Sequence, residues 1–218
     1  MNNRDVHLPG SENRQVTRAA GIIGIATLIS RFLGYVRDMV LASFFGAGMV
    51  ADAFIAAFRI PNLLRRLFGE GSLSIAFIPV FTQVMIKGDK AEGHRLAVGA
   101  LKLLLVVLSL ITMIGIIASP LIVHTIAPGF AKDPQKMALT ITLTRLMFPY
   151  LIMIGTVALC MGILNVLGHF AAPAIAPVLL NLSMIGAVFG ASLFSDSQTV
   201  RGVGLAGGVL IGGVLQLA

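Results

Sequence analysis

The sequence predicts an all-α, polytopic helical membrane protein with about six transmembrane helices. Of its 218 residues, 57% are hydrophobic and only 11% are charged, and the mean hydropathy is +0.95. A soluble domain of this length needs considerably more charge to cover its surface. Three uncharged runs, at 103–123, 146–168 and 170–195, are each near or above the roughly 20 residues that a helix needs to cross a bilayer.

Hydrophobic segments separated by polar or glycine-containing turns mark the expected spans. They lie at about 19–45, 51–84, 96–126, 137–167, 173–194 and 202–218. The second segment is long for one span, and Pro61 and Pro79 are candidate bend sites because each lacks a backbone donor. The last segment ends without closing basic residues, which indicates the front part of a longer protein, truncated within its sixth helix. The expected organisation is therefore a flexible cytoplasmic tail over 1–18 and a transmembrane bundle over 19–218.

The basic residues of the loops predict the orientation of the bundle. One side would hold Arg4, Arg14, Arg18, Lys87, Lys90, Arg95 and Lys102, and the other would hold Lys132, Lys136 and Arg201. This bias predicts a cytoplasmic N-terminus. The polar, basic start of the chain also lacks the pattern of a cleavable signal peptide.

Charged residues interrupt the first two expected spans, where an arginine at the bilayer centre costs roughly 2.5–3.5 kcal/mol on insertion scales. They are Arg31, Arg37, Asp38, Asp52, Arg59, Arg65, Arg66 and Glu70. Helical periodicity places Arg31 and Asp38 on one face of the first span. It places Asp52, Arg59 and Glu70 on a polar stripe of the second, together with Asn62 and Arg66. Two such stripes, joined by a tight turn, predict two walls of a hydrated cavity.

Five arginines against three acids leave two positive charges uncompensated in this set. Surplus arginine favours an anionic ligand, because the planar guanidinium suits phosphate and carboxylate. An alternative is that the charges form structural ion pairs and that Arg37 and Arg65 extend to the headgroup layer. The candidate pairs are Arg31 with Asp38, Asp52 with Arg59, and Arg66 with Glu70.

Other functional classes fit the sequence less well. The net charge of +7 is scattered among the spans rather than gathered on a soluble face, so we expect no nucleic-acid partner. Cys160 lies within an apolar run, and no cofactor or metal site is expected. An enzyme acting on lipid phosphates would need a nucleophile or clustered acids, whereas His94 and His124 have no such partners in the pattern. A multidrug exporter for cations would favour an acidic cavity.

Six motifs, in this order along the chain, resemble those of a known family: SRFLGYVRD, FGAGMVADAF, PNLLRRLFGEGSLSIAFIPVF, APGF, FPYL and PAIAPVLLN. Together they closely resemble the MurJ (MviN) lipid II flippases of bacteria, over essentially the whole chain after the tail. The resemblance implies the multidrug/oligosaccharidyl-lipid/polysaccharide exporter fold of 14 transmembrane helices, whose first six form one lobe beside a central cavity. It also implies a multi-pass protein of the bacterial inner (cytoplasmic) membrane, and a transporter rather than an enzyme.

The implied substrate is lipid II, the undecaprenyl-pyrophosphate-linked disaccharide-pentapeptide precursor of peptidoglycan, moved from the cytoplasmic to the outer leaflet by alternating access. The family's cavity arginines match Arg31, Arg37 and Arg65, and its acidic positions match Asp52 and Glu70. The substrate-binding residues expected from stripe and family together are Arg31, Arg37, Arg59, Arg65 and Arg66, with Asp38, Asp52 and Glu70 as ion-pairing or ion-coupling residues. Other cell-wall synthesis proteins are candidate partners. The alternatives are export of another lipid-linked oligosaccharide or of a drug, and an inactive half-lobe.

Overall fold

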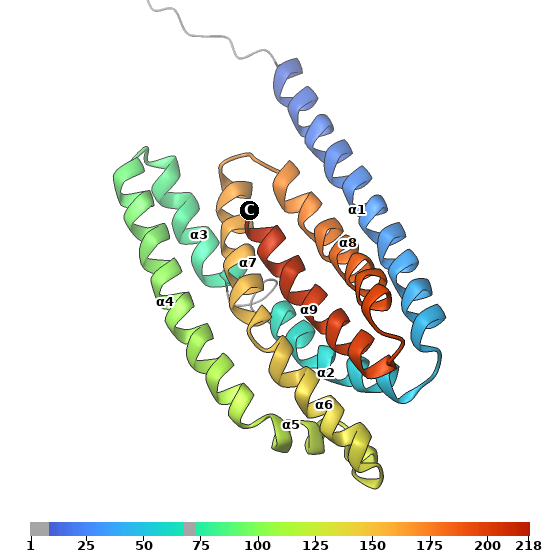
Figure 1. Ribbon diagram of the computed structural model, residues 1–218. Coiled ribbons are helices and arrows are strands. Elements are labelled where there is room, and N and C mark those ends of the chain that lie inside the picture. The colour runs from blue at the N-terminus through green and yellow to red at the C-terminus, as the bar shows by residue number, and fades with distance from the viewer. Residues whose placement is uncertain (1–8, 68–72) are drawn as a thin grey trace, which may run out of the picture.

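The computed structural model describes the backbone of residues 9–67 and 73–218, and their side chains except those of residues 9–20, 22–23, 65–66 and 73–75. Every regular element in this part of the chain is helical, which confirms the all-α prediction (Figure 1). In chain order the elements are α1 (Pro9–Phe45), α2 (Met49–Arg66), α3 (Leu73–Ile86), α4 (Lys90–Ile117), α5 (Ser119–Ile126), the 3₁₀ helix η2 (Pro128–Lys132), α6 (Pro134–Met147), α7 (Tyr150–Val166), α8 (Ala171–Phe194) and α9 (Gln198–Leu217).

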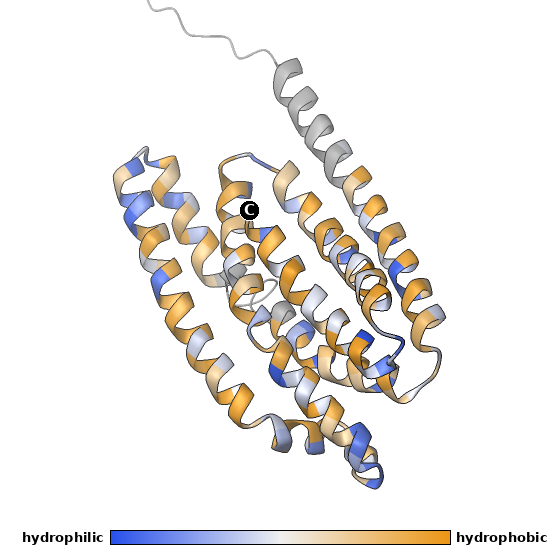
Figure 2. Cartoon of the chain, viewed as in Figure 1, coloured by the Kyte–Doolittle hydropathy of each residue, from blue (hydrophilic) through white to orange (hydrophobic). Residues whose placement is uncertain are grey.

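The long apolar helices identify a multi-pass membrane protein. In the described residues, four helical segments are long and apolar enough to cross a bilayer: α4, Pro134–Val166 (which joins α6 and α7), α8 and α9. The predicted first and second spans correspond to α1 and to α2 with α3, the segments that carry the internal charges. Hydrophobic residues make up much of the described helices (Figure 2). Leu103, Leu110 and Ile117, for example, are at least half exposed along the outer side of α4, as expected of a surface in contact with lipid.

Successive spans alternate in direction across the bundle (Figure 1). The start of α1, the α3–α4 turn and the α7–α8 loop lie at one end, and the α1–α2 turn, η2 and the α8–α9 loop lie at the other. α1 stands at the edge of the bundle, where it packs mainly on α8 and makes little contact with α2. The two charged helices therefore diverge from the short turn that joins them.

The start of the first helix differs from the sequence-based prediction. α1 begins at Pro9, ten residues before the expected start of the first span, because Glu, Arg and Gln continue a helix beyond an apolar segment. α1 therefore includes part of the segment expected as a tail, and residues 1–8 of that segment lie outside the described part. The second expected span corresponds to α2 and α3, and residues 68–72 between them lie outside the described part. Pro61 and Pro79, the candidate bend sites, both lie inside these helices.

The third and fourth spans are each divided, and the two breaks lie against each other. α4 gives way to α5 at Ala118, and α6 gives way to α7 at Phe148 and Pro149. The ring of Phe148 occupies the space over Gly115, where an added Cβ would lie 2.1 Å from Phe148 Cε1. These contacts place the two breaks at the same level of the bundle.

A hydrogen bond also joins the two breaks. Arg145 Nε donates to Ser119 Oγ at 2.8 Å. That hydroxyl in turn donates to the carbonyl oxygen of Ile116, near the end of α4, where helical carbonyls lack their usual partners.

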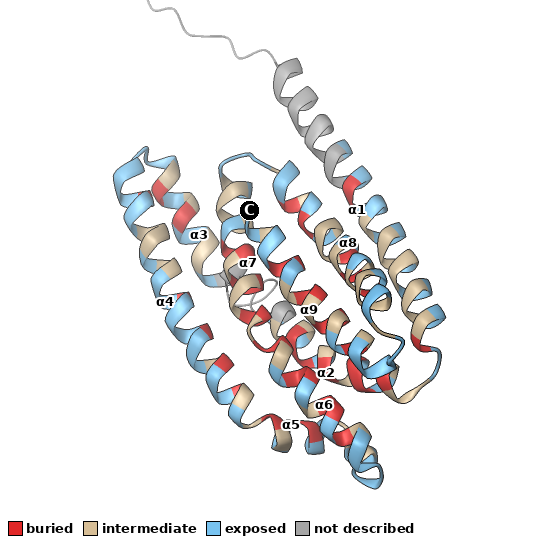
Figure 3. Ribbon diagram, in the orientation of Figure 1, coloured by how far each residue is buried: buried red, intermediate tan, exposed pale blue. Residues whose placement is uncertain are grey.

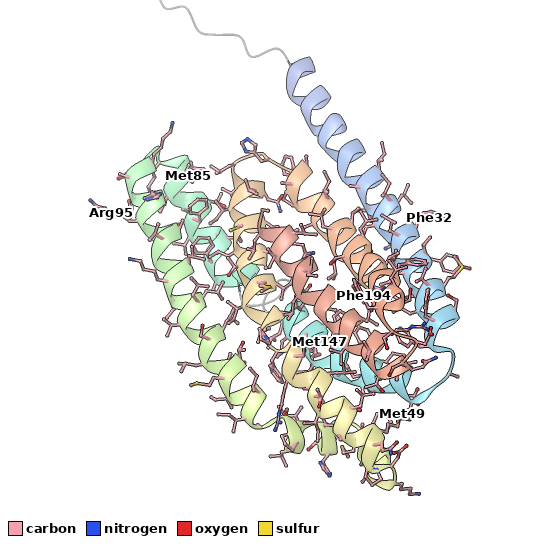
Figure 4. The ribbon with its side chains drawn as sticks, in the orientation of Figure 1. Phe32, Met49, Met85, Arg95, Met147 and Phe194 are labelled. Atoms are coloured by element: carbon pink, nitrogen blue, oxygen red, sulfur yellow. The ribbon has the colours of Figure 1, made fainter. Side chains whose placement is uncertain are left out.

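The core lies where α2, α6, α7, α8 and α9 meet, and the buried positions gather on their inner faces (Figure 3). Met147 and Tyr150 are fully buried there, and Met147 lies near the centre of the bundle in Figure 4. α8 and α9 approach closely because α9 presents glycines at four-residue spacing. An added Cβ at Gly208 would lie 2.4 Å from Ala187 Cβ and 3.1 Å from the carbonyl oxygen of Ser183.

Candidate functional site

The first candidate site is a cleft between the diverging helices α1 and α2, which we call the α1–α2 cleft. Its volume is about 420 Å³. Its polar lining consists of Arg37 and Asp38 from α1 and Arg59 and Asn62 from α2. Most of the remaining wall is apolar and comes from α1 and α2, with Met184 of α8 and Leu205 of α9. The cleft is therefore amphipathic rather than lined throughout by arginine.

Arg37 is held in one orientation by two neighbours. Its Nη1 donates to Asn181 Oδ1 at 2.9 Å, and its Nε and Nη2 donate to Asp38 Oδ1 at 3.0 and 2.8 Å. Asn181 is fixed in turn, because its Nδ2 donates to the carbonyl oxygen of Ser30 at 3.2 Å. The side chain of Arg37 is 23% exposed, so its guanidinium is positioned by α8 yet remains accessible from the cleft.

Arg59 differs from Arg37 in having no such support. It is exposed, and within the described residues it takes part in no ion pair. It lines the α1–α2 cleft and also a second cavity on an adjacent face of α2. A cation in this position is available to an anion entering either space.

The second cavity lies between α2, the end of α5 and η2, and we call it the α2–η2 cleft. Its volume is about 310 Å³. Asp52 and Arg59 supply its charged groups, and Ile55, Ile126 and Phe130 are among its apolar walls.

An ion pair closes one side of the α2–η2 cleft. Lys136 Nζ donates to Asp52 Oδ2 at 2.5 Å and lies 4.2 Å from the centre of the Phe130 ring. Lys136 is thus an additional residue of the site. Its sequence position gave no signal, because it lies 84 residues from Asp52 and was assigned to a loop.

The structure brings together four of the predicted site residues, Arg37, Asp38, Arg59 and Asp52, around these two clefts. Arg31 lies on the same helix as Arg37, is exposed, and lines neither cleft. The backbones of Arg65 and Arg66 belong to α2, but their side chains lie outside the described residues, as does Glu70 as a whole.

Two of the three ion pairs considered from the sequence differ from those observed, and the third, Arg66 with Glu70, lies outside the described residues. Asp38 pairs with its neighbour Arg37 rather than with Arg31. Asp52 pairs with Lys136 rather than with Arg59. Both outcomes leave an arginine of the original set without a carboxylate in the described structure, which preserves a positive surplus at the site.

Comparison with known proteins decides the family. The family model described as "Lipid II flippase MurJ" matches residues 41–218. The chain belongs to the MurJ family. A protein of Bdellovibrio bacteriovorus, described as a probable lipid II flippase MurJ, is 46% identical over 94% of this chain and 39% of its own length. A protein of Rhizobium tropici with the same description is 44% identical over 90% of this chain and 37% of its own length.

A family member of Burkholderia cenocepacia, described as lipid II flippase MurJ, is 40% identical over 87% of this chain and 36% of its own length. The fold also matches a solved structure described as a lipid II flippase MurJ in an inward closed conformation. The TM-score is 0.71 at 25% identity, over 87% of this chain and 40% of that one. The chain thus spans about two fifths of the length of the relatives it matches.

Proposed function

We propose that this chain forms the N-terminal lobe of a flippase that moves lipid II from the cytoplasmic to the outer leaflet of the bacterial inner membrane. Membership of the MurJ family supports the substrate class. The observation that carries the proposal is the position of Arg37, fixed by Asn181 and Asp38 at the edge of an amphipathic cleft. A transporter for a lipid-linked anion needs such a cation at membrane depth.

The charges around the two clefts favour an anionic headgroup. The Arg37–Asp38 and Asp52–Lys136 pairs are each neutral overall, so Arg59 adds a net positive charge. Guanidinium groups bind pyrophosphate through paired, charge-assisted hydrogen bonds. In the proposed function Arg31, Arg65 and Arg66 extend this positive surface along α1 and α2, while Asp38, Asp52 and Glu70 balance it or couple transport to an ion.

Transport would proceed by alternating access, with the headgroup in the clefts and the polyprenyl tail in lipid. The N-terminus would be cytoplasmic, because the start of α1 lies at the same end of the bundle as the basic α3–α4 turn (Figure 1). No covalent step is required, so the protein would act as a transporter and not as an enzyme. The fold supplies one wall of the pathway, and a second lobe would supply the other.

A complementation experiment tests this function. A full-length family member would be expressed with its matching two fifths replaced by this chain, in cells depleted of their own lipid II flippase. We expect the chimera to prevent lysis and its Arg37→Ala variant to fail. Arg95→Ala is the matched control. Arg95 is an exposed arginine near the start of α4, at the edge of the bundle (Figure 4), and it lines neither cleft.

The level of each chimera in the membrane would be measured in parallel. A chimera that inserts at the level of the intact relative and still fails to prevent lysis would contradict the proposed function. Equal growth of the Arg37→Ala and Arg95→Ala chimeras would contradict the role of the cleft.

A further inference from the structure

The proposed function places the headgroup in both clefts but does not say which of its groups the α2–η2 cleft binds. The two spaces lie on adjacent faces of α2 and have Ile55 and Arg59 in common. A substrate that carries a pyrophosphate and a peptide has more than one anionic group to place. The separation raises the question of which group the second cleft fits.

Arg59 sets the net charge of the α2–η2 cleft, because the carboxylate of Asp52 is already paired with Lys136. Lys136 neutralises that carboxylate, and its side chain is only 18% exposed because it is sandwiched between Asp52 and the ring of Phe130. The lysine lies in the first turn of α6, where the helix dipole disfavours a cation. Its placement there is compensated by Asp52 and by the aromatic face.

The walls of the α2–η2 cleft select for aliphatic groups. Apart from its two charged residues, the lining is Ile55, Ala56, Ile126, Ala127 and Phe130. A pyrophosphate has no apolar group to bury against these side chains. A carboxylate next to small aliphatic groups would pair with the guanidinium and remove apolar surface from water at the same time.

We propose that the α2–η2 cleft is a subsite for the carboxylate-bearing, aliphatic end of the substrate peptide. This inference rests on the proposed function. Arg59 binds the carboxylate, and the isoleucines and Phe130 contact the adjacent side chains. Lys136 is a positioning residue, because by holding Asp52 it keeps that carboxylate from competing with the ligand for Arg59.

Two ligands that share the undecaprenyl pyrophosphate and the disaccharide but differ in the peptide test the assignment. The probes are lipid II, which has the peptide, and the undecaprenyl-pyrophosphate-linked disaccharide, which lacks it. Binding of each would be measured to the purified chimera described above. We expect Arg59→Gln to weaken lipid II binding about tenfold or more, the effect of losing a charge-assisted hydrogen bond, and to leave binding of the peptide-free ligand unchanged.

Matched variants separate this role from a general effect of charge. Arg37→Gln is expected to weaken both ligands, and Arg59→Lys to restore part of the lipid II affinity. Lys136→Met should weaken lipid II alone by freeing Asp52, and the double variant Lys136→Met/Asp52→Asn should recover affinity. A purely structural lysine would not be rescued by removing the charge of its partner.

Each remaining outcome has a definite meaning. Equal weakening of both ligands by Arg59→Gln would place Arg59 at the part that the two ligands share and overturn the peptide subsite. No effect on either ligand would remove Arg59 from the binding site, with the same consequence. Failure of the unsubstituted chimera to bind either ligand would overturn the proposed function itself, and the subsite with it.

Discussion

Arg37 of α1 and Asn181 of α8 are joined by a 2.9 Å hydrogen bond, although 144 residues separate them. The same asparagine binds the backbone of α1 at Ser30, so one amide both fastens two helices and orients the guanidinium at the cleft. Packing supports this arrangement, because Gly34 leaves room for the asparagine side chain between the helices. The orientation of Arg37 on α1 is thus set in part by a residue of α8.

Asn181→Leu is expected to reduce flippase complementation severely while the chimera still inserts in the membrane. Leucine keeps the apolar contacts of α8 but cannot accept from Arg37, and hydrogen bonds to charged groups contribute about 1.5–3 kcal/mol. Asn181→Asp should retain part of the function, since a carboxylate accepts the bond from Arg37 but cannot donate to the Ser30 carbonyl oxygen. Growth of depleted cells measures both. Full activity of the leucine variant would show that Arg37 needs no support from α8.

Arg37→Ala and Arg65→Ala are each expected to abolish function without loss of membrane insertion. The lysine variants should rescue only partly, because an ammonium keeps the charge but not the paired donors of a guanidinium. The assay is again growth after flippase depletion, with protein levels measured in the membrane fraction. Full function of both alanine variants would contradict an anion-binding role for these arginines.

Reversing the charges of the Asp52–Lys136 pair tests whether its contribution is mutual. Lys136→Asp alone should impair complementation strongly, since it sets two carboxylates side by side. The double variant Asp52→Lys/Lys136→Asp should recover much of the activity. A half-exposed pair contributes at most about 1 kcal/mol to stability, so the melting temperature should change little. If the double variant were no more active than Lys136→Asp, the role of Asp52 would not depend on its pairing with Lys136.

Most of the fold could be predicted because its main determinant is local. Twenty uncharged residues in a row specify a membrane helix whatever surrounds them, and the predicted fifth span ends at Phe194, as α8 does. Boundaries set by helix propensity were less predictable. The polar residues before Ala19 continue the helix of α1 to Pro9, and hydropathy carries no information about where such an extension starts.

The site was predictable in composition but not in pairing. Charges within apolar segments identified α1 and α2. Lys136 was missed because its contact with Asp52 depends on the packing of α6 against α2. Partners distant in sequence follow from tertiary structure, which periodicity along one helix cannot supply.

Gly208→Ala is expected to lower the melting temperature of the chimera, whereas Gly207→Ala should not. A methyl group at Gly208 would meet Ala187 and the backbone of Ser183, while one at Gly207 would meet nothing within 4 Å. Overpacking of this kind costs about 1–3 kcal/mol. The Gly207→Ala control replaces a neighbouring glycine with alanine, which has the higher helix propensity. Equal melting temperatures for the two variants would show that α8 and α9 can separate without cost.

The paired helix breaks at Ala118 and at Phe148–Pro149 have a mechanical consequence. A continuous helix resists bending because of its regular series of backbone hydrogen bonds. A helix bends most easily where that series is interrupted. Since Phe148 and Arg145 join the two breaks, we expect α5 and α6 to tilt together if either moves relative to α4 and α7. We therefore expect the lobe to bend more readily at this level than along α8 and α9, which have no such break.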